Sequence, residues 1–208
     1  LSNMGIKLHV AWRDKPTRRG FSMIDSQGER AITVIGERLA PNYRDNLDWD
    51  ILKKMDGIFI TASDSEIFKM ARSASILCTT PRVGINTINK SNVSLDGLIG
   101  SNLDPGEEFS FSELLVKPKY TIKTEGEKGG IIFPGGRYEA LKNKDRKVDS
   151  YGCGDSFAAG ILYGMASNWD IDKSLNLAKV IGRDSSEFFG PYANNDEKSV
   201  SYTHLTLP

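Results

Sequence analysis

Short apolar runs alternate with helical segments through the middle of the chain. Residues 49–55 and 66–74 place apolar side chains three to four positions apart, which predicts amphipathic helices. Apolar runs with the length of buried strands lie at residues 57–61, 75–80, 97–100 and 120–124. Because parallel strands are joined through helices, this alternation predicts an α/β fold with a largely parallel sheet sandwiched by helices.

Two β-hairpins are predicted on either side of this alternation. The apolar runs within residues 21–35 flank the polar, glycine-bearing link 26–29, and those within residues 130–141 flank a Pro-Gly-Gly turn. Residues 7–12 alternate polar and apolar side chains ahead of a break that contains proline and glycine. We therefore also expect a strand over residues 7–12.

The chain is expected to close with two helices and a polar tail. Residues 155–166 are rich in alanine and glycine, which allow close packing, and residues 172–188 again have helical spacing. The pattern stops beyond Tyr192, so we expect one domain over residues 1–192. Residues 193–208 then form a polar tail. Its last eight residues, 201–208, resemble translated adapter sequence, and we exclude them from the fold as non-native.

Composition excludes several classes of partner. The 208 residues carry 27 Lys and Arg against 27 Asp and Glu, so no overall field favours nucleic acid or an acidic membrane. The chain contains no apolar stretch of membrane-spanning length, and its first residues lack the apolar core of a signal peptide. Cys78 and Cys153 form neither a disulfide framework nor a metal-binding pair. We expect a cytosolic protein with reduced thiols.

A short glycine-bearing loop that opens into the helix at residues 155–166 carries the strongest chemical signal. Gly152, Cys153 and Gly154 can turn their amides toward one point, where the free N–H groups and the dipole of the helix favour an anion. Asp155 follows at the same terminus, where the dipole stabilises its carboxylate as an acceptor for a hydroxyl proton. This combination suits phosphoryl transfer to an alcohol.

Other interpretations of the same loop are open. In the simplest one, Gly152 and Gly154 make a tight turn and Asp155 is the N-cap of the helix. A Walker A loop ends in Gly-Lys-Ser/Thr, a tripeptide that the chain does not contain. A Rossmann fingerprint needs a small residue where Phe157 stands. Neither of these two established phosphate-binding motifs fits.

The loop instead resembles the signature of a known kinase family. Residues 149–157, Asp-Ser-Tyr-Gly-Cys-Gly-Asp-Ser-Phe, resemble the D-T-x-G-A-G-D-x-F signature of the ribokinase-like, PfkB-type carbohydrate kinases. Residues 124–130 resemble the T-x-G-x-x-G segment of that family, and residues 96–102 resemble the strand that leads to its N-x-x-E motif. Residues 7–36 resemble its sugar-covering β lid. The collinear match over residues 7–192 implies a ribokinase-like, doubly wound, mainly parallel sheet with a small lid.

The resemblance implies an activity and a role for each motif. The activity would be ATP-dependent phosphorylation of a hydroxyl group of a small carbohydrate. Asp155 would be the catalytic base, and the amides of Gly152, Cys153 and Gly154 would form the anion hole. The nucleotide would lie along Thr124, Gly126, Gly129 and Asn102.

The resemblance also implies further cofactors and a partner. Magnesium is implied by ATP chemistry. Many members of the family bind a monovalent cation near the positions of Asp149 and Tyr151. Lid strands in the family often pair between subunits, which implies a homodimer. Neither nucleic acid nor a membrane is expected as a partner.

The chain departs from the family pattern at three places. Pro105 stands where the N-x-x-E motif has its glutamate, so the acidic residue that organises the metal is unassigned. The neighbouring acids are Asp104, Glu107 and Glu108. Cys153 replaces a usual alanine, a change between small residues that leaves the amide available. Nothing before Lys7 matches the first strand of the family, so we expect a kinase without its amino-terminal third. Such a chain would bind nucleotide weakly and turn over sugar slowly or not at all.

Three other functions are compatible with the residues. A nucleoside kinase of the same superfamily would share the anion hole. A non-catalytic nucleotide-binding fragment would keep residues 152–154 without depending on Asp155. A dinucleotide-dependent oxidoreductase is the alternative from a different fold, and an NAD-induced rise in melting temperature would reveal it. The sequence leaves the substrate open, because specificity depends on lid contacts that no pattern resolves.

Overall fold

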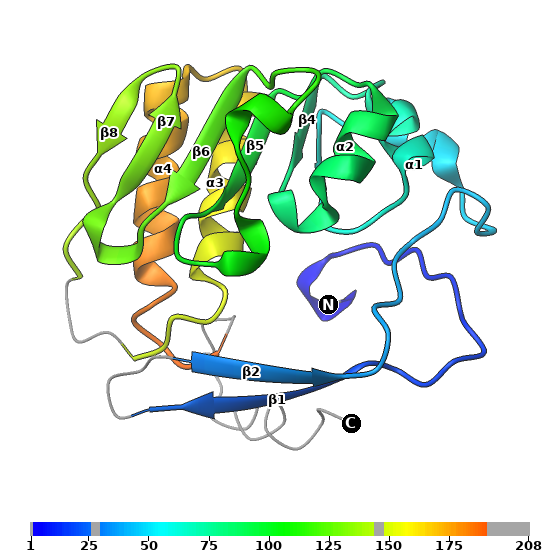
Figure 1. Cartoon of the computed structure of the whole chain (residues 1–208), viewed down its shortest axis with the longest axis horizontal. Helices are drawn as coiled ribbons and strands as arrows, with labels where there is room; N and C mark the ends of the chain where they lie inside the picture. Colours follow the sequence, from blue (N-terminus) through cyan, green and yellow to red (C-terminus); the bar gives the residue numbers. More distant parts are fainter. Residues whose placement is uncertain (1, 26–29, 144–147, 191–208) are drawn as a thin grey trace.

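The computed structural model describes residues 2–25, 30–143 and 148–190, and its centre is a mixed β-sheet (Figure 1). The described sheet has six strands in the order β3-β4-β5-β6-β7-β8. They are β3 (Gly57–Ile60), β4 (Ile76–Thr79), β5 (Gly97–Ser101), β6 (Tyr120–Thr124), β7 (Gly130–Phe133) and β8 (Gly136–Tyr138). Strands β3 to β6 are parallel, whereas β7 and β8 are antiparallel to their neighbours. The predicted parallel sheet and its carboxyl-terminal hairpin are confirmed.

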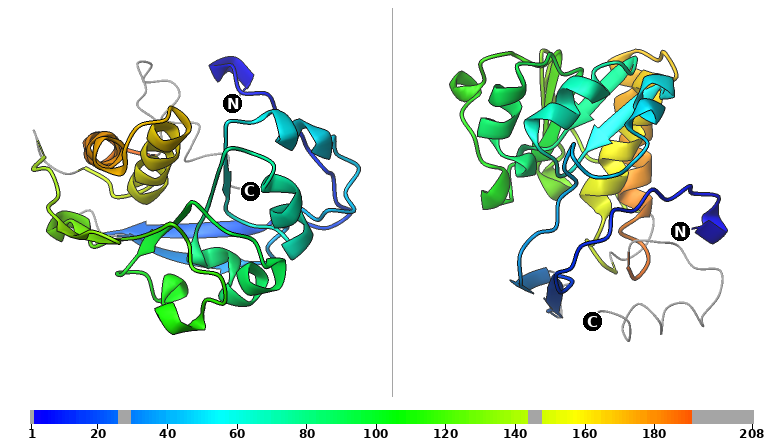
Figure 2. Two further views of the ribbon diagram at one scale, coloured as in Figure 1. Left: turned by 90° about the horizontal axis from the view of Figure 1, so that it is seen from above. Right: turned by 90° about the vertical axis from the view of Figure 1, so that its right-hand side faces the viewer.

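Helices cover both faces of this sheet. They are α1 (Ser65–Ala71), α2 (Ile85–Ser91), α3 (Cys153–Ala166) and α4 (Ile171–Asp184). Side chains of α1 and α2 pack in one buried cluster with Leu77 and Leu98, and those of α3 and α4 pack in another with Cys78 and Ile99. Because successive residues of a strand point to opposite faces, these neighbours reach different clusters. The α/β fold is therefore doubly wound, with α3 and α4 side by side (Figure 2).

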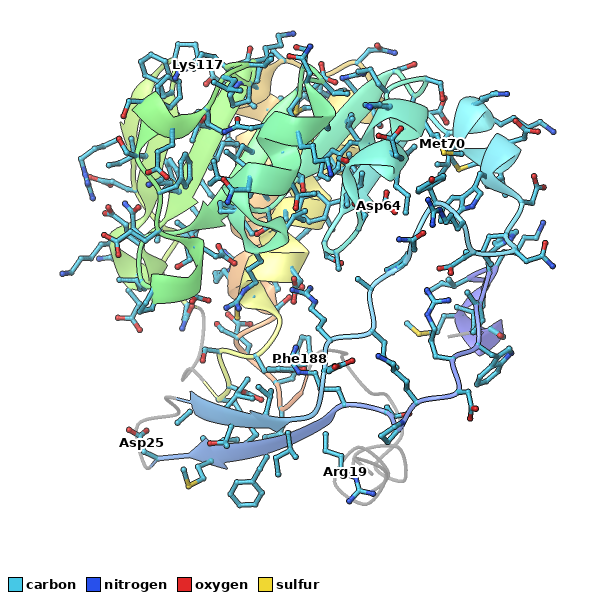
Figure 3. The ribbon with its side chains drawn as sticks, turned by 45° about the vertical axis from the view of Figure 1, so that its right-hand side comes forward. Arg19, Asp25, Asp64, Met70, Lys117 and Phe188 are labelled. Carbon is cyan, nitrogen blue, oxygen red and sulfur yellow. The ribbon has the colours of Figure 1, made fainter. Side chains whose placement is uncertain are left out.

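Asp64 shows how local chemistry places the first helix. One carboxylate oxygen, Oδ1, accepts hydrogen bonds from the amides of Glu66 and Ile67 at 3.0 and 3.1 Å, which satisfies two free donors at the start of α1. The other, Oδ2, accepts from the Tyr43 amide at 2.9 Å. Asp64 therefore ties the incoming chain to the start of α1, where Figure 3 labels it.

A two-stranded β ribbon lies apart from the main sheet. Strands β1 (Arg19–Ile24) and β2 (Arg30–Ile35) are antiparallel, with Arg19 opposite Ile35. Figure 3 labels Arg19 and Asp25 near the two ends of β1, and Lys117 at the far side of the body from the ribbon. The two strands of the predicted first hairpin are confirmed, whereas its link, residues 26–29, lies outside the described residues.

Three element predictions need correction. Residues 7–12 form no strand, because no described segment lies in register to accept the hydrogen bonds of an extended backbone. Residues 49–55 contain a 3₁₀ helix, Trp49–Lys54, in place of an α-helix. Helix α4 ends at Asp184, before the predicted Phe188.

No helix among the described residues has the length and apolarity to cross a membrane. The polar tail 193–208 lies outside the described residues.

Candidate functional site

The predicted site residues gather at the edge where the parallel strands end. The arrowhead of β6 and the first turn of α3 both face the ribbon in Figure 1, since the helix runs opposite to the strands. Open α/β sheets bind ligands at the carboxyl ends of their strands, where loops replace the regular backbone pairing. The edge carries two groups of residues, which are the loop before α3 and the turn after β6.

The loop before α3 leaves backbone donors free. Gly152 is the N-cap and has φ 83° and ψ −4°, a left-handed conformation that glycine adopts without strain. The Cys153 amide donates to Ser150 O at 3.3 Å, and the Ser156 amide donates to Gly152 O at 2.8 Å. Among the described residues, no acceptor faces the amides between them, those of Gly154 and Asp155. These two donors can bind an anion.

The surroundings of Gly154 are open as well. A Cβ atom built on Gly154 would meet no heavy atom within 4 Å, so packing does not require glycine at this position. The helix begins at Cys153, two residues before the predicted start, and both open amides therefore belong to its first turn. The helix dipole and these donors act at the same place, which strengthens the attraction for a negative charge.

Asp155 is exposed in this first turn and makes no hydrogen bond to a described residue. The structure decides against one alternative interpretation of the loop, because the N-cap is Gly152 and no side chain caps α3. The carboxylate of Asp155 is thus available to a ligand. A carboxylate beside two open amides can accept a proton from a bound hydroxyl while the amides hold an anion.

Asp149 anchors the same loop from below the surface. Its side chain is fully buried, and a buried carboxylate requires hydrogen-bond donors. Oδ1 accepts from the Tyr151 amide at 3.0 Å and Oδ2 accepts from the Gly190 amide at 3.1 Å. The amides of Val148 and Asp149 donate to Ser186 O at 2.8 and 3.3 Å. These contacts fix the loop to the chain after α4, a role that the sequence did not indicate.

The turn after β6 brings Thr124, Gly126 and Gly129 together. The amide of Glu125 donates to Gly129 O at 2.7 Å and closes the turn. Gly129 has φ 82°, and a Cβ at this position would lie 2.0 Å from Tyr138 O, so only glycine fits. The hydroxyl of Thr124 donates to Gly100 O at 3.4 Å. Backbone packing against β8 therefore requires glycine at position 129.

Asn102 joins this turn from the neighbouring strand. Its backbone amide donates to Thr124 O at 2.9 Å, and its side-chain Nδ2 donates to Glu125 Oε1 at 2.8 Å. Arg137 Nη2 donates to the other oxygen of Glu125, Oε2, at 2.6 Å. The hydrogen bond from Arg137 and then the one from Asn102 lower the pKa of Glu125 below its ordinary value. The structure thus brings Asn102 to the predicted nucleotide residues.

Glu107 turns toward the end of β5. Its Oε2 accepts from the Ser101 amide at 2.6 Å, and its Oε1 accepts from Arg82 Nε at 2.9 Å. A Cβ on Gly100 would lie 2.7 Å from Glu107 Oε2, so the glycine makes room for this carboxylate. Asp104 also pairs with Arg82, and Glu108 is exposed. Of the three acids around Pro105, Glu107 is the one that contacts β5, and the sequence contains no signal for this contact.

The two thiols differ in their surroundings. Cys78 is buried in the sheet, and burial raises the pKa of its thiol to about 12. Cys153 is partly exposed, and its Sγ lies 3.9 Å from Asp149 O. Within the described residues no group of three or more His, Cys, Asp or Glu side chains is arranged to hold a metal. The Cys153 amide is engaged with Ser150 O at 3.3 Å, so it is not one of the open donors of the loop.

A comparison with protein families finds a match to the carboxyl-terminal part of the chain. Residues 111–194 match the model described as pfkB family carbohydrate kinase. This part of the chain is therefore similar to the pfkB family. The pfkB segment contains the turn after β6, the hairpin β7–β8 and the loop with Asp155. Asn102 lies before it. A search of the curated proteins found no match.

Solved structures share the fold of most of the chain. A probable sugar kinase from Rhizobium etli CFN 42 is 17% identical with a TM-score of 0.65, covering 93% of this chain and 67% of its own. Adenosine kinase from Sinorhizobium meliloti is 18% identical with a TM-score of 0.65, covering 91% of this chain and 66% of its own. Arabidopsis thaliana ribokinase, complexed with ribose and ATP, is 16% identical with a TM-score of 0.61, covering 85% and 65%. The chain thus spans about two thirds of these structures, and the fold is ribokinase-like.

Proposed function

We propose that the chain belongs to an ATP-dependent kinase that phosphorylates a hydroxyl group of a small carbohydrate. One observation carries the proposal. The exposed carboxylate of Asp155 stands in the same helical turn as the open amides of Gly154 and Asp155, at the carboxyl edge of the sheet. The pfkB match over residues 111–194 and the likeness to a sugar kinase support it.

The proposed chemistry divides two tasks within one turn of α3. Asp155 accepts the proton of the substrate hydroxyl while the hydroxyl oxygen attacks the γ-phosphorus of ATP. The bond from that phosphorus to the leaving ADP oxygen breaks. The predicted anion hole of Gly152, Cys153 and Gly154 needs one change, because the Cys153 amide donates to Ser150 O at 3.3 Å. The open amides of Gly154 and Asp155 are the proposed donors to the anion. These amides stabilise the charge on the transferred phosphoryl group, and this stabilisation contributes more to catalysis than the proton transfer to Asp155 does.

The turn after β6 is the proposed place of the nucleotide. The backbone of this turn includes Thr124, Gly126 and Gly129. The side-chain amide of Asn102 lies against the same turn. The Arabidopsis ribokinase of similar fold is complexed with ATP, which supports this nucleotide. In contrast, Glu107 and Glu125 are engaged with Arg82 and Arg137.

These residues fit magnesium that arrives with the nucleotide. The paired carboxylates do not offer a cage made by the protein alone, and magnesium commonly binds substrate phosphates with one or two carboxylates. Asp155 and Glu127 are exposed carboxylates at this edge that could contact the metal. When bound, the metal would neutralise phosphate charge. A monovalent cation near Asp149 and Tyr151 stays a prediction.

A nucleoside is the second candidate for the acceptor. The adenosine kinase from Sinorhizobium meliloti has the same TM-score, 0.65, as the probable sugar kinase. Both acceptors present a hydroxyl to the same base and anion hole, so the chemistry at Asp155 is unchanged. A non-catalytic nucleotide-binding fragment would differ in a measurable way, because its binding would continue and no phosphoryl transfer would occur.

The test replaces the proposed base. Asp155→Asn keeps the size of the side chain and removes its basicity, so we expect phosphoryl transfer to fall about a thousandfold with ATP affinity nearly unchanged. Product formation from labelled ATP, with a panel of sugars and nucleosides, measures transfer, and calorimetry measures affinity. Asp172→Asn is the matched control, an exposed acid in the first turn of α4. If Asp155→Asn and the wild type transferred the phosphoryl group equally well, Asp155 would have no part in the mechanism. If NAD raised the melting temperature and ATP did not, an oxidoreductase would be favoured.

A further inference from the structure

We propose that Glu125, paired with Arg137, is a positioning residue that sets Asn102 and balances charge at the nucleotide turn. The inference rests on the proposed function, since it names how the same edge accepts a triphosphate. Glu125 touches three elements at once. Its backbone closes the turn onto Gly129 O at 2.7 Å, and its carboxylate reaches Asn102 at the end of β5 and Arg137 on β8.

The contact with Asn102 determines which end of that side chain meets a ligand. A side-chain amide has a donor end and an acceptor end that point in different directions. The donor end of Asn102, Nδ2, is engaged with Glu125 Oε1 at 2.8 Å, and the backbone is fixed by the bond to Thr124 O. The carbonyl oxygen is therefore the end available to the site. Asn102 is then set to accept a hydrogen bond from a ligand hydroxyl or from water.

The contact with Arg137 determines the charge of the turn. A lone carboxylate next to Gly126 and Gly129 would repel the phosphates of a nucleotide. Arg137 Nη2 donates to Glu125 Oε2 at 2.6 Å. The side chain of Glu125 is only 16% exposed, whereas that of Arg137 is 58% exposed, so the carboxylate is the shielded member of the pair. Arg137 also holds the pKa of Glu125 low, which keeps the carboxylate ionised as an acceptor for Asn102. Glu125 is therefore an acceptor for Asn102 whose own charge is balanced by Arg137.

The same turn contains a residue that separates this role from general effects of charge. Glu127 lies two positions further on and is exposed. No hydrogen bond joins its side chain to a described residue. A variant at Glu127 changes the charge of the turn by the same amount as one at Glu125 and leaves Asn102 and Arg137 in place. Glu127 is thus the matched control.

The experiment compares ligands that differ only in phosphate charge. Dissociation constants of ATP, ADP and adenosine are measured by calorimetry for wild type, Arg137→Gln, Glu125→Ala, the double variant Glu125→Gln/Arg137→Gln, and Glu127→Ala. We expect Arg137→Gln to weaken ATP binding about tenfold, ADP binding less, and adenosine binding little, because it leaves the Glu125 carboxylate unneutralised. The double variant restores most of the ATP affinity, since it removes that charge and keeps an acceptor for Asn102.

Glu125→Ala tests the positioning role with the uncharged ligand. It removes the acceptor for Asn102 and should weaken adenosine binding about fivefold, while Glu127→Ala stays near wild type. ATP should lose less than adenosine, because the unpaired Arg137 then attracts its phosphates. Equal losses for ATP, ADP and adenosine in Arg137→Gln, or no recovery in the double variant, would show a merely structural pair and overturn the inference. If Glu125→Ala binds adenosine no more weakly than Glu127→Ala does, that result alone would overturn the inference. A wild type that binds no adenine nucleotide would overturn the proposed function as well.

Discussion

The α/β body and the β1–β2 ribbon treat their apolar side chains in opposite ways. In the body Phe68, Leu77 and Leu98 are fully buried, whereas in the ribbon Phe21 and Ile35 are 63% and 67% exposed. The body buries its side chains because helices cover both faces of the sheet. An isolated two-stranded hairpin has no layer to pack against and is marginally stable in water. The difference shows that buried apolar packing stabilises the body and contributes little to the ribbon.

The register of the ribbon explains why covering matters. Phe21, Met23 and Ile35 share one face, and Ile24, Ile32 and Val34 share the other. A strand pair with one solvated face usually alternates apolar and polar residues. Here both faces carry exposed apolar side chains. Burial of one face against a second copy of the ribbon, the homodimer that the resemblance implies, would remove this exposed surface.

The largest expected effect tests the packing difference directly. Phe68→Ala removes a fully buried ring from the body and should lower the free energy of unfolding by about 3–5 kcal/mol. Phe21→Ala, the matched change in the ribbon, should lower it by less than about 0.5 kcal/mol, because the ring is already exposed. Urea denaturation of both variants measures the difference. Similar losses would show that the ribbon packs as part of the body.

An intermediate effect concerns self-association. Phe21→Ser places a hydroxyl on the face with Met23 and Ile35, and it should raise the dissociation constant of a homodimer about tenfold. Sedimentation equilibrium measures this constant. Tyr163→Ser is the control, since Tyr163 is similarly exposed, at 60%, on α3 of the body. A wild type that is monomeric at every concentration would exclude the homodimer.

The smallest expected effect concerns the link between ribbon and body. Arg13 and Asp45, which lie on the two segments that flank the ribbon, form a two-pronged ion pair at 2.5 and 2.6 Å. The hydrogen bond from Arg13 lowers the pKa of Asp45, so the pair stabilises the folded chain above the unfolded pKa of about 3.9 and is lost as the pH falls through the lower folded value. Carboxyl NMR should place the Asp45 midpoint below about 3.9. Arg13→Gln should raise it, while Lys15→Gln, which breaks the neighbouring pair with Glu37, should leave it unchanged.

Much of the body could be predicted because its signals are local. Strand β6 spans Tyr120–Thr124 as predicted, since a β-branched, apolar run is followed directly by a glycine turn. The glycines at 126 and 129 likewise indicate a turn that only glycine can make. The loop before α3 was predictable for the same reason, because its glycines and the following helix lie within a few residues of each other.

The remaining features depend on contacts between distant residues. Helix α2 was not predicted, because Ile85–Ser91 is short and begins after Gly84 without a side-chain cap. The alternation at residues 7–12 predicted a strand, although alternation cannot show whether a partner strand exists. The links of Glu125 to Asn102 and Arg137 join separate strands, and no spacing along the sequence indicates them.

Strand β5 has a consequence for cooperativity. Leu98 and Ile99 are adjacent in this strand, yet each belongs to a different buried cluster, and the strand ends next to Asn102. Local opening of either cluster would therefore disturb the strand that presents Asn102. A ligand held at this edge would in turn raise the free energy of opening on both faces of the sheet together. The two layers of the body are expected to exchange amide hydrogens as one unit.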